Sequence, residues 1–408
     1  MKISSRVKNM QYSPVRKLVP LADKARKEGV TVYGFHIGQP DVKTPDSFFN
    51  GVANYQEKIV KYTNSQGLPE LVDAFYESYA KSGINLQKDD IVITNGGSEA
   101  LQFAITVICN ESDEVLVPEP YYSNYDSFLR IADAKLVPIE TKLEDGYRLP
   151  KKGEITKLIN SKTRAILFSN PCNPTGVVLN DEEIEMLKQI ALEYDLYLIS
   201  DEVYKQFIYD KSCKFTSIMN VEGIEDRAIL VDSISKHYSA CGARIGVVAS
   251  KNKEFMAEVL KLCQARLSVS TIEQYATTSL LSGIDLYMND VRKEYRKRRD
   301  TMCSILNKIE GVSVCKPDSA FYVLVKLPVD DIEKFAKWLL EEFRYKNQTL
   351  MFATGPGFYS REHHDKGIQE ARFSFCSYNP DEIIRGIDVL KQALKEYKGR
   401  IWEVKQIV

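Results

Sequence analysis

SISKHYSACGARIG, residues 233–246, places a single lysine, Lys236, just after the apolar run AILV at 228–231. A short apolar run bounded by small polar residues predicts a buried strand. Ligands of open parallel sheets bind at the carboxyl ends of the strands, so a lysine at this position is a candidate ligand-binding residue. A lysine that simply opens an exposed helix is the alternative interpretation of the same stretch.

Six further apolar runs resemble the one before Lys236. They alternate with longer segments of helical periodicity, such as 98–108 and 181–195. Strands that are apolar throughout and alternate with helices predict a mostly parallel sheet covered on both faces, which is an α/β fold. The six runs lie at 91–94, 114–118, 135–139, 164–169, 196–200 and 244–250.

The pattern after about residue 252 predicts a second, smaller α/β lobe. Long helical segments come first, and two apolar strands then alternate with two helical stretches, at 321–327, 330–344, 371–377 and 381–397. We expect the small lobe to be built from the two chain ends. The expected parts are an N-terminal segment that contributes to the small domain (1–45), the large domain (46–299) and the small C-terminal domain (300–408).

Composition excludes some partners. The 408 residues hold 55 Lys and Arg against 56 Asp and Glu, which gives no reason to expect nucleic acid or an anionic membrane as partner. The eight cysteines form no C-x-x-C pair, and no apolar run is long enough to span a membrane, so we expect a soluble cytoplasmic protein.

Two polar stretches have more than one interpretation. The pair His363–His364 could belong to a metal cluster, but it has no partner at ligand spacing, so we expect an exposed polar loop and no metal site. The charged run at 292–299 contains a single aromatic residue, Tyr295. We therefore expect it to be a solvated helix face and not a nucleic-acid patch.

The residues around several strand ends suit a ligand that bears a phosphate. A helix that opens with glycine and serine offers free backbone N–H groups and a favourable dipole to an anion, while two serines and an arginine near Lys236 add hydroxyl donors and a guanidinium. Neither G-x-x-x-x-G-K-[ST] nor G-x-G-x-x-G occurs in the chain. A phosphate beside a strand-end lysine suggests a cofactor held through an imine. The expected phosphate-binding residues are Gly97, Ser98, Glu99, Ser233, Ser235 and Arg244.

Three motifs in order carry a family resemblance: NPCNPTG at 170–176, SDEVY at 200–204 and SISKHYSACGARIG at 233–246. Together they resemble the class I aminotransferases of fold type I, which use pyridoxal 5'-phosphate. The resemblance extends from near residue 37 to residue 375 and is nearest to the prokaryotic aspartate aminotransferase-like branch. It implies that the large domain binds the cofactor.

The resemblance also implies roles toward the cofactor. Lys236 resembles the Schiff-base lysine that afterwards moves a proton, a task that needs an amine whose pKa can be lowered. Asp201 resembles the carboxylate that pairs with the pyridine nitrogen. Tyr204 and Asn173 resemble the pair that binds the phenolic oxygen, and Tyr122 falls where an aromatic ring stacks on the cofactor.

On the substrate side, Arg372 resembles the arginine that binds the α-carboxylate, and Gly38 and Asn173 resemble further contacts to it. Tyr62 resembles a tyrosine that reaches the phosphate of the neighbouring subunit, which implies a homodimer with shared active sites. An acidic substrate needs a second cation for its distal carboxylate. Three candidates stay open for that cation: Lys205, Arg148 and Arg266.

The resemblance therefore implies a ping-pong aminotransferase that acts on an amino acid and a 2-oxo acid. Aspartate with 2-oxoglutarate is the first expectation, while alanine and aromatic amino acids stay open as donors. A carbon–sulfur β-lyase is the main alternative within the same cofactor class. A non-catalytic regulator that binds pyridoxal phosphate is the alternative outside enzymes, and no fused DNA-binding domain favours it.

Overall fold

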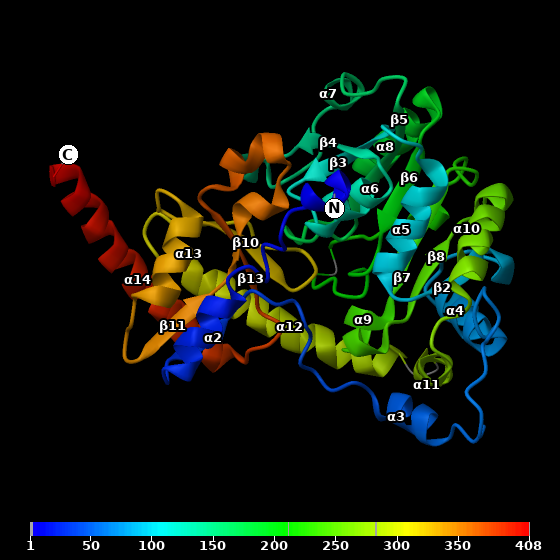
Figure 1. The fold of residues 1–408 in the computed structure, drawn as a ribbon, viewed down its shortest axis with the longest axis horizontal. Coiled ribbons are helices and arrows are strands. Elements are labelled where there is room, and N and C mark those ends of the chain that lie inside the picture. Colours follow the sequence, from blue (N-terminus) through cyan, green and yellow to red (C-terminus); the bar gives the residue numbers. More distant parts are fainter. Residues whose placement is uncertain (1–2, 211, 282–283, 408) are drawn as a thin grey trace.

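The structure is a computed structural model that describes residues 3–210, 212–281 and 284–407. Figure 1 shows two lobes, a larger one around a long twisted sheet and a smaller one around a short sheet. The larger sheet has seven strands and the smaller has four. This arrangement confirms the predicted α/β fold with a second, smaller lobe.

The seven-stranded sheet has the order β2-β8-β7-β6-β5-β3-β4. The neighbours from β7 to β4 run parallel, as the sequence predicts, whereas β8 runs antiparallel to both β7 and β2. The strands are β2 (Ile91–Thr94), β3 (Glu114–Glu119), β4 (Lys135–Glu140), β5 (Thr163–Ser169), β6 (Tyr197–Asp201), β7 (Ala228–Ser233) and β8 (Gly246–Ala249).

Successive strand residues of this sheet enter two separate apolar clusters because their side chains point to opposite faces. In β2, for example, Ile91 and Ile93 join one cluster and Val92 joins the other. Helices α4 (Pro69–Lys81), α8 (Asp181–Tyr194) and α11 (Thr271–Leu281) pack into the first cluster. Helices α5 (Gly97–Ile108), α6 (Asn124–Ile131) and α10 (Lys253–Arg266) pack into the second. The sheet is thus covered on both faces.

The smaller lobe joins both ends of the chain. Strand β1 (Thr31–Gly34) pairs in parallel with β11 (Gln348–Met351). The four-stranded sheet is antiparallel and contains β12 (Ala353–Thr354), β13 (Glu370–Ser374), β10 (Tyr322–Lys326) and β9 (Ser313–Val314). Around these strands lie α2 (Val19–Lys27), α13 (Ile332–Glu341) and α14 (Pro380–Ile407), and Figure 1 shows the end of α14 projecting from this lobe.

The helix α12 (Ile284–Leu306) runs between the lobes in Figure 1 and crosses the expected domain boundary at residues 299 and 300. The division of the chain into three parts stays a prediction. The prediction of a solvated face at 292–299 is wrong for Arg298 and Arg299, which are buried. Arg298 binds Asp41 at 2.8 Å and Arg299 binds Asp210 at 3.0 Å, so both arginines fasten α12 to neighbouring segments.

Short segments complete the fold. They are α1 (Ser5–Lys8), α3 (Asp46–Ala53), α7 (Lys152–Thr156), α9 (Ile234–His237), and the 3-10 helices η1 (Lys88–Asp90), η2 (Leu143–Asp145), η3 (Ile218–Asn220), η4 (Cys241–Ala243), η5 (Gly355–Phe358) and η6 (Arg361–Gly367). The N-terminal segment bridges both lobes, since Arg6 pairs with Asp133 on the large lobe and Lys17 pairs with Glu333 on α13.

The expectation of an exposed polar loop at the histidine pair needs correction. His363 on η6 contacts the carboxylate of Glu119, a fully buried residue at the end of β3. Within the described ranges, no group of three or more potential ligands could hold a metal ion. The helices in those ranges also include none with the length and apolar character that crossing a membrane requires.

Candidate active site

A cleft of about 630 Å³ lies at the carboxyl ends of the parallel strands and reaches into the smaller lobe. It brings together all the sequence-predicted site residues except Glu99 and Tyr62. Those that line it are Gly38, Gly97, Ser98, Tyr122, Asn173, Asp201, Tyr204, Ser233, Ser235, Lys236, Arg244 and Arg372. Parallel strands present their ends at one sheet edge, so residues far apart in sequence meet there.

Glu99 and Tyr62 lie outside the cleft. The Glu99 carboxylate accepts a hydrogen bond from the backbone N–H of Asn95 at 2.7 Å, and its own backbone N–H donates to the Gly96 carbonyl. Glu99 therefore stabilises the start of α5 and does not face a ligand in this cleft. The Tyr62 side chain is 77% exposed and projects from the surface of the chain.

The start of α5 is a tight backbone cradle. Gly96 has a φ of 78°, and a Cβ on it would lie 2.2 Å from Nη2 of Arg244. A Cβ on Gly246 would lie 2.4 Å from the Gly96 carbonyl carbon, so β8 packs directly against this turn. Only glycine fits at both positions. The first N–H groups of α5, at Gly97 and Ser98, have no intrahelical acceptor and are left to bind an anion.

Side chains from the SISKHYSACGARIG stretch complete the cradle. The hydroxyl groups of Ser233 and Ser235 are 2.7 Å apart, and the Ser233 hydroxyl also donates to the Ile245 carbonyl at 2.9 Å. Arg244 has a left-handed φ of 57° and donates to the Cys241 carbonyl at 2.9 Å. These contacts fix two hydroxyls and a guanidinium beside the start of α5, a donor set that suits a phosphate.

Lys236 lies on α9 at the end of β7, as the sequence predicts. Its Nζ donates to the Gly38 carbonyl at 2.7 Å and lies 3.7 Å from Sγ of Cys241. Burial by itself would lower the pKa of this amine, but nearby phenols and thiols, led by Tyr322 and Cys241, raise the pKa above its usual value. The expected lowering is therefore absent here, because these groups favour the charged ammonium.

Asp201 ends β6 and is buried beneath the cleft. Burial raises the pKa of its carboxyl group to about 6. The Tyr125 hydroxyl donates to Oδ2 at 2.7 Å, and the backbone N–H of Val203 donates to Oδ1 at 3.3 Å. A buried carboxylate gains most from a cationic partner, so this position suits a protonated ring nitrogen.

Arg372 on β13 has one buried nitrogen without a partner. Its Nη1 donates to Oδ1 of Asn173 at 2.9 Å, and its Nη2 donates to the His36 carbonyl at 2.8 Å. Its guanidinium carbon lies 4.1 Å from the centre of the Tyr322 ring. Nε is buried without an acceptor, which makes it available to a carboxylate. The contact between Arg372 and a substrate carboxylate stays a prediction.

Several residues that line the cleft were not predicted from the sequence, among them Tyr322 and part of the N-terminal segment. The Tyr322 hydroxyl lies 2.9 Å from the Tyr204 hydroxyl, and a Cβ on Gly38 would lie 1.8 Å from the same Tyr322 oxygen. The position of Tyr322 at the start of an apolar strand was the available signal. The other contributor is the N-terminal segment, from which Val15 and Arg16 line the cleft. The sequence of that segment has no periodicity or motif that predicts a place in the cleft.

Comparison with known proteins now identifies the family. Residues 31–350 match the family model described as aminotransferase class I and II. The chain belongs to this family. Two curated relatives extend over almost all of this aminotransferase. A probable aspartate/prephenate aminotransferase of Aquifex aeolicus is 30% identical over 97% of this chain and 99% of its own length. A probable aspartate aminotransferase of Methanocaldococcus jannaschii is 31% identical over 96% and 99%.

Solved structures of aminotransferases have the same fold. The aspartate aminotransferase from Thermus thermophilus with maleate superposes with a TM-score of 0.86 at 27% identity, covering 96% of this chain and all of that chain. An alanine aminotransferase from Pyrococcus furiosus superposes with a TM-score of 0.88 at 28% identity, covering 97% and 100%. The predicted fold-type I architecture is confirmed.

This aminotransferase uses pyridoxal 5'-phosphate, as its family does. The residues of the cleft fit that cofactor. The cradle that a Cβ at Gly96 or Gly246 would fill accommodates a phosphate, and buried Asp201 accommodates a protonated ring nitrogen. Lys236 lies in the same cleft. The cofactor expected from the sequence is therefore confirmed.

Proposed function

We propose that this aminotransferase transfers the amino group of aspartate to 2-oxoglutarate in a ping-pong reaction in which Lys236 moves the proton. One observation carries this proposal. Lys236, Asp201 and Arg372 come from three separate elements, and all three line one cleft. An amine, a buried acid and a guanidinium are what amino-group transfer at the Cα of an amino acid requires.

When bound, pyridoxal phosphate supplies an electron sink for the negative charge that develops at the substrate Cα. The chain does the rest. Arg372 binds the α-carboxylate through a guanidinium held by Asn173 and His36. Lys236 takes the proton from Cα and returns it in the reverse direction. Tyr122, which lines the cleft, would cover a face of the cofactor ring and exclude water from it.

The three cations expected as partners for a distal carboxylate are engaged elsewhere. Lys205 is buried in an ion pair with Asp232. Arg148 pairs with Glu183 at 3.0 Å, and Arg266 donates to two backbone carbonyls at 3.3 Å each. None of these cations lines the cleft. The expectation that one of them binds the substrate side chain is therefore not supported.

Arg16 is the better candidate for that partner. The cleft is lined by four cations, of which Lys236, Arg244 and Arg372 already have roles. In the described part of the chain, no hydrogen bond or ion pair engages the Arg16 side chain. We therefore assign it to the distal carboxylate of an acidic amino acid, a charge-assisted contact that discriminates aspartate from alanine.

Replacing Arg16 with glutamine tests this specificity. We expect kcat/KM for aspartate to fall about 10- to 100-fold, because a hydrogen bond to a charged group is lost, while kcat/KM for alanine is unchanged. Steady-state kinetics with both donors measure the ratio. Lys17→Gln is the matched control, since Lys17 pairs with Glu333 and does not line the cleft. An equal loss of kcat/KM for both donors would show that Arg16 does not bind the substrate side chain.

The reaction itself is tested with substrates supplied one at a time. Aspartate given alone to the holoenzyme should release close to one equivalent of oxaloacetate per active site, and 2-oxoglutarate added afterwards should yield glutamate. Alanine and aromatic amino acids serve as the comparison panel. Continuous release of pyruvate and ammonia from an amino acid with a sulfur leaving group on Cβ, such as cystathionine, without a 2-oxo acid would favour the β-lyase instead. Cofactor binding with no turnover of any amino acid would favour the regulator.

We further propose that the enzyme is a homodimer. Exposed apolar side chains gather on α3 and the segment that follows it, which is unusual for a surface that faces only water. They are Phe49, Val52, Ile59, Val60 and Tyr62. A second copy that covers them would place Tyr62 near the partner's phosphate site. Sedimentation equilibrium should give twice the chain mass, and Ile59→Asp with Val60→Asp should give monomers. A wild-type monomer would contradict the proposal.

A cytoplasmic location is proposed on the state of the cysteines. All eight are free thiols in the structure, which suits a reducing compartment. Cell fractionation that recovers the protein in another compartment would contradict it.

A further inference from the structure

Tyr125 on α6 is tied to Asp201 by a short hydrogen bond. Its hydroxyl donates to Oδ2 of Asp201 at 2.7 Å, and its side chain is 1% exposed. The other oxygen of Asp201 accepts only a longer bond of 3.3 Å from the backbone N–H of Val203. Among the described residues, Tyr125 makes the only side-chain hydrogen bond to this carboxylate. The orientation of the carboxylate therefore depends mainly on this phenol.

Tyr125 also contacts the residue expected to stack on the cofactor. The rings of Tyr122 and Tyr125 lie 5.5 Å apart at an angle of 88°, an edge-to-face contact. One side chain thus touches both Asp201 and Tyr122, which line the cleft from different elements. A shift of the Tyr125 ring would move both of these contacts together.

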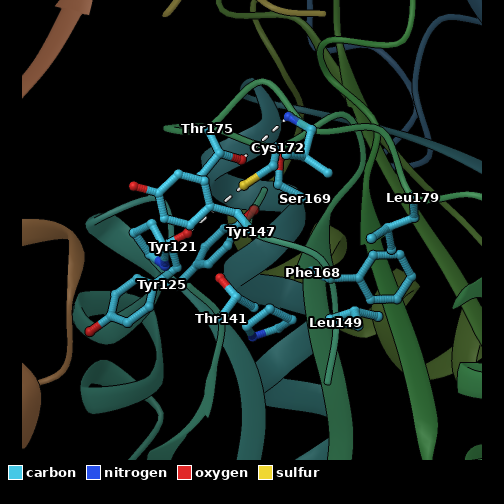
Figure 2. Close-up of a pocket in the computed structure, with 13 residues that line it drawn as sticks. Tyr121, Tyr125, Thr141, Tyr147, Leu149, Phe168, Ser169, Cys172, Thr175 and Leu179 are labelled. Carbon is cyan, nitrogen blue, oxygen red and sulfur yellow. Dashed lines mark hydrogen bonds between the residues drawn. The ribbon is translucent and has the colours of Figure 1, made fainter. Parts of the chain in front are cut away.

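A small cavity lies on the other side of the Tyr125 ring. Figure 2 shows it with the rings of Tyr121, Tyr125 and Tyr147 on one side and Phe168 and two leucines on the other. Its volume is about 30 Å³. Side chains beside empty space are held less firmly by packing, because they lack contacts on that side. The hydrogen bond to Asp201 therefore adds to the packing that fixes the position of the Tyr125 ring.

We propose that Tyr125 is a positioning residue that holds the Asp201 carboxylate in the orientation needed to pair with the cofactor ring nitrogen. This inference rests on the proposed role of Asp201 in the transamination. Tyr125 itself does not line the cleft, so it acts through Asp201 and Tyr122.

The charge on Asp201 gives the proposal a measurable pH dependence. Burial raises the pKa of Asp201 to about 6, whereas the hydrogen bond from Tyr125 lowers the pKa. Removing the hydroxyl should therefore raise the pKa further, so that the carboxylate is lost at a higher pH. The other titratable groups that face Asp201 are Tyr122, Cys172, Lys205 and Asp232.

Tyr125→Phe is the decisive variant. We expect the acidic limb of kcat/KM to move up by about one pH unit, because a hydrogen bond to a charged group of ordinary strength is lost. The absorbance of the bound cofactor should titrate with the same upward shift, which is a readout independent of turnover. Tyr121→Phe is the matched control: it removes a hydroxyl from the same cavity wall without touching the Asp201 carboxylate. The control should change neither the pH profile of kcat/KM nor the titration of the cofactor absorbance.

The double variant Tyr125→Phe with Asp201→Asn separates this inference from the proposed function. With no carboxylate to hold, Tyr125→Phe should add no further loss of kcat and no further spectral shift to Asp201→Asn. A holoenzyme of Tyr125→Phe with unmoved profiles overturns the inference while leaving the role of Asp201 intact. If Asp201→Asn retains full activity, both the inference about Tyr125 and the proposed function are contradicted. Circular dichroism of each variant confirms that the fold is kept.

Discussion

Lys236→Ala is expected to lower kcat by at least about 10³-fold, because the variant loses the general base that we propose for the substrate Cα. The amine has no substitute close by. Its nearest polar contacts are the Gly38 carbonyl and the Cys241 thiol, and neither is an amine that could replace it. The imine link that the sequence predicts between Lys236 and the cofactor would be lost as well, so the spectrum of the bound cofactor should change. Single-turnover kinetics and absorbance measure the two effects.

The control for this variant is Lys261→Ala, which removes the same charge from an exposed position on α10 where the amine pairs with Glu258. It should retain wild-type kcat and spectrum. A small added amine such as methylamine should restore part of the activity of Lys236→Ala, because it replaces the missing base. Retention of kcat within tenfold of wild type by Lys236→Ala, together with an unchanged spectrum, would refute the role given to this residue.

Arg372→Lys is expected to reduce kcat/KM for every amino acid by about 30- to 1,000-fold, the usual loss when one partner of a buried charge pair is truncated. The guanidinium holds Asn173 and His36 with two nitrogens and still offers Nε. A lysine ammonium is a point charge without this planar fork, so it cannot keep both protein contacts and bind a carboxylate. Most of the loss should appear in KM.

Cofactor affinity separates a specific effect of this variant from general damage. Arg372 lies on β13 in the smaller lobe, away from the phosphate cradle, so the dissociation constant for pyridoxal phosphate should stay near the wild-type value. Arg385→Lys, an exposed position on α14, is the matched control and should change neither quantity. An Arg372→Lys enzyme with an unchanged KM would mean that another group binds the α-carboxylate.

Strand positions were predictable because the large sheet is covered on both faces. The run at 91–94 coincides with β2, the run at 228–231 stops two residues before the end of β7, and the other parallel strands differ by one residue at an end or by a shift of one. A strand buried on both faces is apolar throughout, so its limits coincide with the limits of the apolar run. The direction of β8 was not predictable, since an apolar run has the same composition read either way.

The expected start of that strand at residue 244 also failed. Arg244 has a left-handed backbone and belongs to the turn, and β8 begins only at Gly246. The residue type predicted that the Arg244 side chain binds a phosphate. It did not predict the conformation of the Arg244 backbone. Its conformation depends on the close packing of Gly246 against Gly96, two residues that are 150 positions apart.

The sequence by itself determined the candidate residues of this protein: two of its motifs place Lys236 and Asp201 at the ends of predicted strands, which meet at one sheet edge, and a later strand carries Arg372. Only the tertiary structure decided which cations are free. Lys205 and Arg148 are as basic in sequence as Arg16, but buried ion pairing and hydrogen bonding engage the first two and leave the third in the cleft. Whether a cation is available to bind a substrate depends on neighbouring side chains from distant segments of the chain. Only folding brings those side chains together.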